Sequence, residues 1–414
     1  MTVHRLGNNL TVVLVPNPAL PLVTADAWFR VGAGDEPRHL AGVSHYLEHM
    51  LFKGTAHLGP GEYDRRIEAL GGYLNAATSF DYTHYYIELP SEGLRRGLDD
   101  FADVLRNSSI TPHEVDSERK VILEEIARKN DDPTGFLYDK VRTEAMRAGA
   151  YSHPVIGFEE SVAALTRDQL ADHYERFYAP ENTTLVLAGA FDRGSALASV
   201  EEAFGGWSRP LRPHRTAAPA SDFTQPARRH YERPWSDLYF ALTFPAPAVR
   251  TVEEEAAADL AGTVLGSSRT TRLVARLREQ DRLVSSISAW VPTNREPSLA
   301  YIGGRCAAKN FGAALDGAFE EVAALLRDGF RPGELGRARR TLATSHLLAR
   351  ETNSATASII GHSRVLYGND DGFARYAEAL RACPPEAVLA QIGAVFRREA
   401  ASVFTTGPEA PPDA

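Results

Sequence analysis

The chain has 414 residues, of which 43% are hydrophobic and 24% are charged, and its formal net charge at pH 7 is −9. These proportions are typical of a folded globular protein, and the length suits two domains of about 200 residues each. The negative charge argues against nucleic-acid binding, and no apolar run is long enough for a membrane helix. Cys306 and Cys383 are too few for a disulfide framework. The N-terminus lacks a signal-peptide pattern, so we expect a cytoplasmic protein.

The chain begins with strand and turn signals. Apolar and β-branched residues at 11–15 and 23–31 predict two strands, and Pro16-Asn-Pro18 predicts the turn that follows the first. The next helix is entered through Gly42-Val-Ser44, and we expect Ser44 to cap its N-terminus.

This helix carries His45-Tyr-Leu-Glu48-His49, the inverted form of the zincin motif H-E-x-x-H. At about 100° per residue, His45 and His49 project from the same helix face, where two imidazoles can share one metal ion. Glu48 lies on the flank of that face, where it can take a proton from water without being a ligand. A catalytic zinc usually has three protein ligands, so a third must come from elsewhere in the chain.

The next predicted elements lead to a candidate third ligand. They are a helix at 61–69, a strand at 75–88, helices at 91–107, 112–129 and 165–177, and a strand at 182–190. The helix at 112–129 carries Glu118 and Glu125, which lie almost two turns apart at the edge of its apolar arc, whereas Glu124 points away from it.

A carboxylate against a core face is costly unless a partner pairs with it, and a metal ion would do so. Glu125 is the better third ligand, and Glu118 is an auxiliary acid. A solvated helix face with incidental glutamates is the alternative. The residues that we expect to form the apolar arc are Val115, Val121, Ile122 and Ile126.

The segment 208–225 separates two halves. It is rich in Pro, Arg and Ala without an apolar period, so it is the predicted linker between a first domain at 1–207 and a second at 226–406. Residues 407–414 form a tail that we expect to be disordered.

The second half repeats the order of elements of the first only faintly. It is predicted to begin with strands at 227–233 and 238–244 and a helix at 252–265. The passage at 271–290 parallels 66–78 in the first half. The second half has no H-x-x-E-H motif of its own.

Several motifs occur together along the chain. The H-x-x-E-H motif is followed by the E-x6-E helix, and the segment 71–85 reads G-G-x-x-N-A-x-T-x-x-D-x-T-x-Y. His153-Pro-Val-Ile-Gly157 and Tyr178-Ala-Pro-Glu-Asn182 come next. This series resembles the M16 metallopeptidases, the group of pitrilysin and the mitochondrial processing peptidase, over essentially the whole chain.

The resemblance implies an α+β fold of two homologous domains. Each would be a mostly antiparallel sheet packed with helices, and together they would form half of a clam-shell peptidase whose second domain is catalytically silent. It also implies Zn²⁺ bound by His45, His49 and Glu125, with Glu48 as the base and Glu118 orienting His49 or steadying the zinc shell from behind.

By resemblance, the segment 75–85 is an edge strand that pairs with an extended peptide substrate. We expect Asn75 to bond the substrate backbone, Ala76 to keep the strand face open, and Gly72 to belong to the same binding segment. A turn residue after Gly71-Gly72 is the alternative for Asn75.

One position departs from the family. Active members resemble L-R-x-x-x-x-L-x-Y in the second half, whereas this chain has Arg278 followed by Ser285 at the Tyr position. A serine hydroxyl is much shorter than a phenol, and losing one oxyanion donor costs roughly a hundredfold or more in rate. The family includes paired subunits, so we predict the zinc-bearing member of a heterodimer whose homologous partner carries the Arg/Tyr pair. A homodimer is the alternative, and Arg278 is either a substrate-binding residue or a plain surface arginine.

The sequence therefore predicts a zinc metalloendopeptidase that acts on peptides or unfolded segments. A non-proteolytic scaffold and a peptide-binding subunit are the alternatives. The intact set of His45, Glu48, His49 and Glu125 argues against the scaffold, whereas Ser285 keeps the peptide-binding subunit open.

Overall fold

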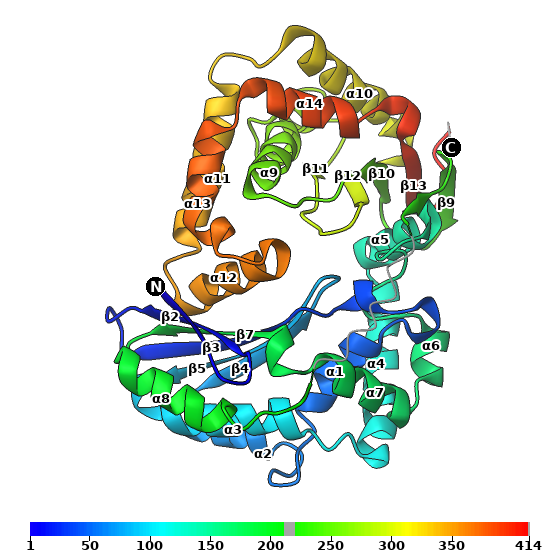
Figure 1. Cartoon of the computed structure of the whole chain (residues 1–414). Coiled ribbons are helices and arrows are strands. Elements are labelled where there is room, and N and C mark those ends of the chain that lie inside the picture. Colours follow the sequence, from blue (N-terminus) through cyan, green and yellow to red (C-terminus); the bar gives the residue numbers. More distant parts are fainter. Residues whose placement is uncertain (211–219, 413–414) are drawn as a thin grey trace. The chain divides into compact units, whose positions relative to one another are not determined.

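The computed structural model describes residues 1–210 and 220–412, and these divide into two compact units (Figure 1). Unit 1 contains residues 1–127, 153–210 and 349–373. Unit 2 contains the other described residues. The units thus follow the two halves of the sequence, except that 128–152 belong to unit 2 and 349–373 belong to unit 1.

Unit 1 is built on a sheet with the strand order β1-β2-β7-β3-β5-β4. Neighbouring strands are antiparallel except for β2 and β7, which are parallel. Strand β4 lies at one edge, where Tyr73 faces Glu88 of β5 and Thr78 faces Thr83. The strands are β1 (Thr2–Arg5), β2 (Thr11–Pro16), β3 (Leu22–Phe29), β4 (Tyr73–Thr78), β5 (Thr83–Pro90) and β7 (Thr183–Gly189).

Helices cover both faces of this sheet, because successive strand residues point to opposite sides. Ala25, Ala27 and Phe29 of β3 join the main core with the helices of one face. On the other face, Val13 and Val186 pack with α12. Figure 1 shows α3 and α8 on one side of the sheet and α12 on the other. The helices are α1 (Val43–Leu51), α2 (Glu62–Ala69), α3 (Leu94–Asn107), α4 (Pro112–Asn130, with 128–130 in unit 2), α6 (Glu159–Ala164), α7 (Arg167–Phe177), α8 (Arg193–Phe204) and α12 (Asn353–Tyr367).

Unit 2 has a sheet with the order β11-β12-β10-β13-β9, in which only the β13–β9 pair of the described strands is parallel. Helix α5 packs against β10 and β13, and α9 packs against β11. A short strand pair joins β6 (Met146–Ala148) to β8 (Asp222–Phe223). The sheet strands are β9 (Arg228–Glu232), β10 (Leu238–Ala246), β11 (Ser286–Trp290), β12 (Ser298–Cys306) and β13 (Ser402–Gly407). The helices are α5 (Pro133–Ala145), α9 (Val252–Gly266), a π-helix (Val274–Gln280), α10 (Phe311–Asp328), α11 (Glu334–Leu348), α13 (Asp371–Ala382, which begins in unit 1) and α14 (Pro385–Val395).

The two sheets repeat one topology. Strands β2, β3, β4, β5 and β7 correspond in chain order and in sheet position to β9, β10, β11, β12 and β13, and the parallel pair lies at the same place in both sheets. The first α-helix between the second and third strands of each series is α1 in unit 1 and α9 in unit 2, and each is followed by a second helix, α2 or the π-helix. The internal repeat that was faint in the sequence is therefore clear in the topology.

The predicted fold class, α+β with two homologous domains of mostly antiparallel sheet and helices, is confirmed. The clam-shell arrangement and the domain boundaries at 207 and 226 stay predictions. Part of the predicted linker 208–225 and the last residues of the predicted tail 407–414 lie outside the described residues.

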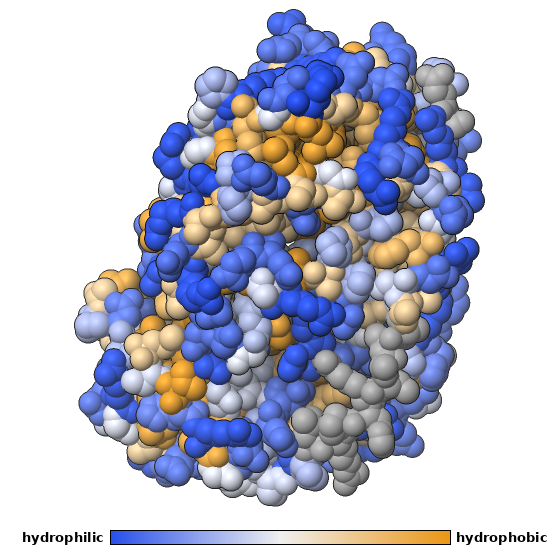
Figure 2. All heavy atoms as spheres, turned by 45° about the horizontal axis from the view of Figure 1, so that its top comes forward, coloured by the Kyte–Doolittle hydropathy of each residue, from blue (hydrophilic) through white to orange (hydrophobic). Residues whose placement is uncertain are grey.

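No helix in the described part of the chain is long and apolar enough to cross a membrane. Figure 2 shows that hydrophilic residues cover most of the face that it displays, with apolar residues gathered in smaller groups.

Candidate metal centre

Helix α1 has one buried face and one partly exposed face. Tyr46, Leu47 and Met50 are buried in the core, and the Tyr46 hydroxyl donates to the carbonyl oxygen of Val115 on α4. This packing fixes the rotation of the helix about its axis. His45 and His49, one turn apart, therefore share the other face.

The N-terminus of α1 is capped by a residue of the loop that precedes it. The helix starts after Gly42, whose φ of 95° suits glycine, and a Cβ there would lie 2.6 Å from the carbonyl oxygen of Ile156. The Glu36 carboxyl group accepts the backbone N–H groups of Gly42 and Ser44, both at 2.7 Å. Burial raises the pKa of Glu36 to about 8, although these two donors oppose the shift.

The prediction that Ser44 caps α1 is wrong. The Ser44 side chain instead forms a buried hydrogen bond of 3.1 Å between its Oγ and Nε2 of His173 on α7. Burial lowers the pKa of His173 to about 3, so this imidazole is neutral at ordinary pH. Ser44 thus ties the metal-site helix to α7, and Glu36 takes the capping role.

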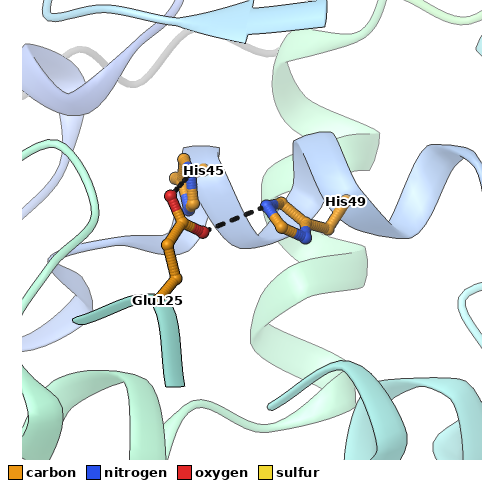
Figure 3. Close-up of side chains that lie close together, drawn as sticks. All are labelled: His45, His49 and Glu125. Carbon is orange, nitrogen blue, oxygen red and sulfur yellow. Dashed lines mark ion pairs between the residues drawn. The ribbon is translucent and has the colours of Figure 1, made fainter. Parts of the chain in front are cut away.

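The three predicted ligands meet in space (Figure 3). Nε2 of His45 lies 3.8 Å from Oε1 of Glu125, and Nε2 of His49 lies 3.7 Å from Oε2 of Glu125. One ligand atom from each residue lies within 4.8 Å of the other two. The exposed fractions of the side chains are 14% for His45, 22% for His49 and 37% for Glu125, so the cluster is open on one side.

This donor set fits zinc. Ligand atoms about 2.0–2.1 Å from a tetrahedral zinc lie roughly 3.3 Å apart, so these ligand atoms, which lie within 4.8 Å of one another, would draw together by up to about 1.5 Å around the ion. Nitrogen and carboxylate ligands are those that zinc takes in catalytic sites. Three protein ligands leave the fourth position for water or substrate.

Glu118 lies behind His49. Its Oε1 accepts a 2.8 Å hydrogen bond from Nδ1 of His49, which leaves Nε2 of His49 with its lone pair for a metal. Its Oε2 lies 2.6 Å from Nζ of Lys53. Burial would raise the pKa of Glu118, but the bonds to His49 and Lys53 outweigh it and hold this pKa below its usual range.

The buried face of α4 differs from the predicted apolar stripe at one position. The buried residues are Val115, Glu118, Ile122 and Ile126, whereas the Val121 side chain is 42% exposed. Glu118 takes the place in the helical period that we predicted for Val121. The site thus uses a core position for a carboxylate, which His49 and Lys53 make tolerable.

Glu48 lies on the flank of α1 and contacts the edge strand. Oγ1 of Thr78 on β4 donates to Oε2 of Glu48. Burial raises the pKa of Glu48 above its usual range, while the Thr78 bond and the His49 charge act against the shift. Leu74, Ala76 and Thr78 have the same parity in β4, so the alternation of the strand is the signal by which Thr78 could have been found. No local pattern marks Glu36.

The predicted substrate-binding residues lie on or next to β4. Asn75 is engaged within its own strand, because its Nδ2 donates to Tyr73 Oη at 2.9 Å and its Oδ1 accepts from the Ala76 N–H at 2.8 Å. A Cβ on Gly72 would lie 2.3 Å from Cδ2 of Leu89, so packing alone explains this glycine. The roles of these residues in substrate binding stay predictions.

Arg278 belongs to unit 2, in the π-helix. Its Nε lies 3.8 Å from Oε1 of Glu279, and its side chain is 41% exposed. Ser285 bonds through its hydroxyl to Nε and the carbonyl oxygen of Arg305, both at 3.0 Å. The serine at the expected tyrosine position is thus held by a neighbouring strand.

Comparison with known proteins identifies relatives that all belong to one peptidase family. Residues 11–158 match the family described as Insulinase (Peptidase family M16), and residues 164–342 match the Peptidase M16 inactive domain. An uncharacterized zinc protease of Mycobacterium leprae is 31% identical over 371 residues, which cover 89% of this chain and 83% of the relative. The β subunit of the mitochondrial processing peptidase of Blastocladiella emersonii is 28% identical over 377 residues, covering 88% of this chain and 80% of the subunit.

The fold also matches solved structures. A protease from Helicobacter pylori superposes with a TM-score of 0.91 at 21% identity, over 98% of this chain and 99% of that one. Since several relatives are named zinc proteases, the fit of the His45, His49 and Glu125 cluster to zinc agrees with the cofactor predicted from the sequence.

Proposed function

Because the chain belongs to the M16 family of zinc metallopeptidases, we propose that it is a zinc-dependent endopeptidase acting on peptides or unfolded segments. The observation that supports this most is the meeting of three ligand atoms beside a half-buried acid, Glu48, at a sheet edge. A module that only bound peptides would need the edge strand but neither the convergent ligands nor the half-buried acid.

In this proposal, His45, His49 and Glu125 hold the zinc ion. When bound, zinc supplies a Lewis acid that polarises the scissile carbonyl group and lowers the pKa of water. Glu118 keeps the His49 ring in place and its Nδ1 protonated, so that Nε2 faces the ligand position.

Glu48 is the proposed general base. Thr78 donates to Oε2, so Oε1 of Glu48 is the oxygen that takes the proton from the attacking water. The carboxyl group then passes this proton to the amine nitrogen of the leaving fragment. Proton transfer by a correctly positioned side chain typically accelerates a reaction by about 10²–10⁴-fold.

The substrate is proposed to pair as an added strand with the free edge of β4. Main-chain hydrogen bonds along this edge give affinity with little dependence on sequence. Asn75 would exchange its bonds to Tyr73 and Ala76 for bonds to the substrate backbone. Ala76 would keep the strand face open, and Gly72 would belong to the same binding segment.

We further propose that the chain works as the zinc-bearing member of a dimer. Ser285 is bonded to Arg305 and is shorter than the tyrosine at this position in active relatives, so oxyanion donors are expected from a homologous partner. Arg278 is exposed and remains the donor that this chain itself would offer. A homodimer is the alternative assembly. The cytoplasmic location stays a prediction.

Zinc content and peptide cleavage test the proposal. Wild type, Glu48→Gln, Glu125→Gln and the matched control Glu124→Gln, an exposed neighbour on α4, are purified with and without a homologous subunit that carries the Arg/Tyr pair. We expect about one zinc per chain in all but Glu125→Gln. Cleavage of a quenched fluorescent peptide should need the partner and should be lost in Glu48→Gln but not in Glu124→Gln.

Other outcomes point to other functions. A wild type without stoichiometric zinc would indicate the scaffold. Equal behaviour of wild type and Glu48→Gln with the partner present would indicate a peptide-binding subunit. Brisk turnover by the isolated chain would refute the need for a partner.

A further inference from the structure

Unit 2 contains a polar cavity remote in sequence from the metal ligands. It has a volume of about 170 Å³ and lies between the end of α9, the turn that follows it, and the first turns of α11. Most of its lining side chains end in a hydroxyl or a guanidinium group: Thr263, Ser267, Ser268, Thr270, Thr271, Arg337, Arg340 and Thr341. Val264 and Ala338 supply the small apolar part.

Two positive charges in this cavity are not balanced by the chain. Arg337 and Arg340 lie three residues apart on α11, so they share a helix face. Neither guanidinium group has a hydrogen bond or an ion pair in the part of the chain that the structure describes. This is notable in a chain with a net charge of −9.

The one acid of the lining, Glu334, is already neutralised. Its two oxygens each lie 2.8 Å from nitrogens of Arg272, which is 2% exposed, and Oε2 also accepts the Arg331 N–H. Glu334 therefore does not cancel the charges of Arg337 and Arg340. The cavity as a whole is positive.

A hydroxyl group of α9 also faces the cavity, and no partner for it occurs in the described chain. Thr263 is 8% exposed and lines the cavity, and no hydrogen bond of its side chain occurs among the described residues. Ser267, by contrast, donates to the Thr263 carbonyl oxygen at 3.2 Å. The Thr263 hydroxyl is therefore available to donate to an acceptor in the cavity.

We propose that this cavity binds a tetrahedral oxyanion, namely inorganic phosphate or the phosphoryl group of a small metabolite. Guanidinium groups form paired bonds with phosphate oxygens, and the Thr263 hydroxyl, unlike those of Ser267 and Thr271, is available to donate to a further oxygen. A carboxylate has only two oxygens and would leave part of this donor set unused. The ligand binds in the catalytically silent half, independently of the peptidase proposal.

Calorimetric titration of the full-length chain with inorganic phosphate, at fixed pH and ionic strength, tests this site. Wild type should bind phosphate saturably, and Arg337→Ala/Arg340→Ala should weaken binding by roughly tenfold or more. The matched control is Arg250→Ala/Arg381→Ala, which removes the same charge from exposed positions of unit 2 outside the cavity. Thr263→Val, which keeps the charge, should weaken binding by about threefold.

The arms of the titration also identify the source of the phosphoryl group. Glycerol 3-phosphate binding more tightly than inorganic phosphate would identify a phosphorylated metabolite, and weaker binding would identify the free ion. Acetate should not bind. The proposal would be overturned if wild type and both double variants bound phosphate equally, as they would if phosphate bound at the zinc site. It would also be overturned if wild type showed no saturable binding.

Discussion

Helices α1 and α9 occupy corresponding positions beside two sheets that have the same topology, yet they contact the edge strands of these sheets differently. In unit 2, α9 packs directly on β11: a Cβ on Gly266 would lie 2.6 Å from the Ala289 nitrogen, and one on Gly262 would lie 3.0 Å from the Trp290 Cα. In unit 1, α1 contacts β4 through Glu48 and Thr78 and leaves its histidines open. Glycines thus let α9 pack closely against β11 in unit 2, whereas polar side chains lie between α1 and β4 in unit 1.

The two helices also start differently. Thr251 caps α9 through a local, exposed capping box with Glu254. Helix α1 is capped by Glu36, which is buried and lies six residues before Gly42. The exposed cap of α9 is solvated, whereas the buried Glu36 ties the start of α1 to the loop that precedes it.

The largest expected effect comes from the buried cap. The folded protein holds the Glu36 proton to a pKa of about 8, against an ordinary value of 4.5, so its contribution to stability is full below pH 4.5 and is lost as the pH rises to 8. Urea unfolding should show the stability of wild type relative to Glu36→Gln falling by about 4 kcal/mol over this range. Thr251→Ala should cost about 1 kcal/mol at every pH. A constant difference for Glu36→Gln would contradict this contrast.

The second-largest expected effect is on the packing of α9 against the edge strand β11 in unit 2. Gly266→Val places a side chain where even a Cβ would meet the β11 backbone, so we expect a loss of about 3 kcal/mol in the free energy of unfolding. Zinc content should not change, since the ligands belong to unit 1. The matched control is Gly7→Ala, because no atom lies within 4 Å of the added Cβ. Gly329→Ala is unsuitable because the φ of Gly329 is positive. A stable Gly266→Val protein would show that α9 can move off β11.

Glu118→Gln removes the charge behind His49 and leaves Lys53 without its partner. We expect zinc affinity to fall by about 10–100-fold, measured by competition with a chelator. Glu124→Gln on the same helix is the control and should bind zinc as wild type does. Unchanged affinity in Glu118→Gln would mean that packing alone orients His49.

The smallest expected effect concerns the hydrogen bond between Thr78 of β4 and Glu48 of α1. Thr78→Val removes the hydroxyl donor to Glu48, and we expect kcat to fall about tenfold with zinc content unchanged, because a hydrogen bond to a charged group contributes about 1.5 kcal/mol. Thr78→Ser keeps the donor and should restore most of the rate. Equal losses in both variants would assign Thr78 a packing role.

Much of the site was predictable because its signals are local. The spacing of His45, Glu48 and His49 on one helix needs only the helical period, and the choice of Glu125 over Glu124 follows from the same period on α4. The strand alternation in β4 contained the information on Thr78, although the sequence analysis gave this residue no role.

Other features were not predictable because they depend on tertiary contacts. Ser44 has the residue type of a cap, but His173 competes for its hydroxyl group and Glu36 takes the cap. Val121 has the residue type of a core position, but the bonds to His49 and Lys53 give that position to Glu118. Neither competition can be read from local periodicity.

The exchange of helices between the sequence halves has a consequence for how the chain attains its structure. Helix α12, encoded late, lies against Trp28, where a Cβ on Gly361 would be 2.2 Å from the indole nitrogen. Helix α5, encoded early, lies against the other sheet, where a Cβ on Gly303 would be 2.1 Å from the Tyr138 hydroxyl. Each half thus lends the other a part of its core. Unit 1 therefore lacks part of its core until residue 373 has been synthesised, and separate fragments 1–207 and 226–414 would each lack a helix of its own unit.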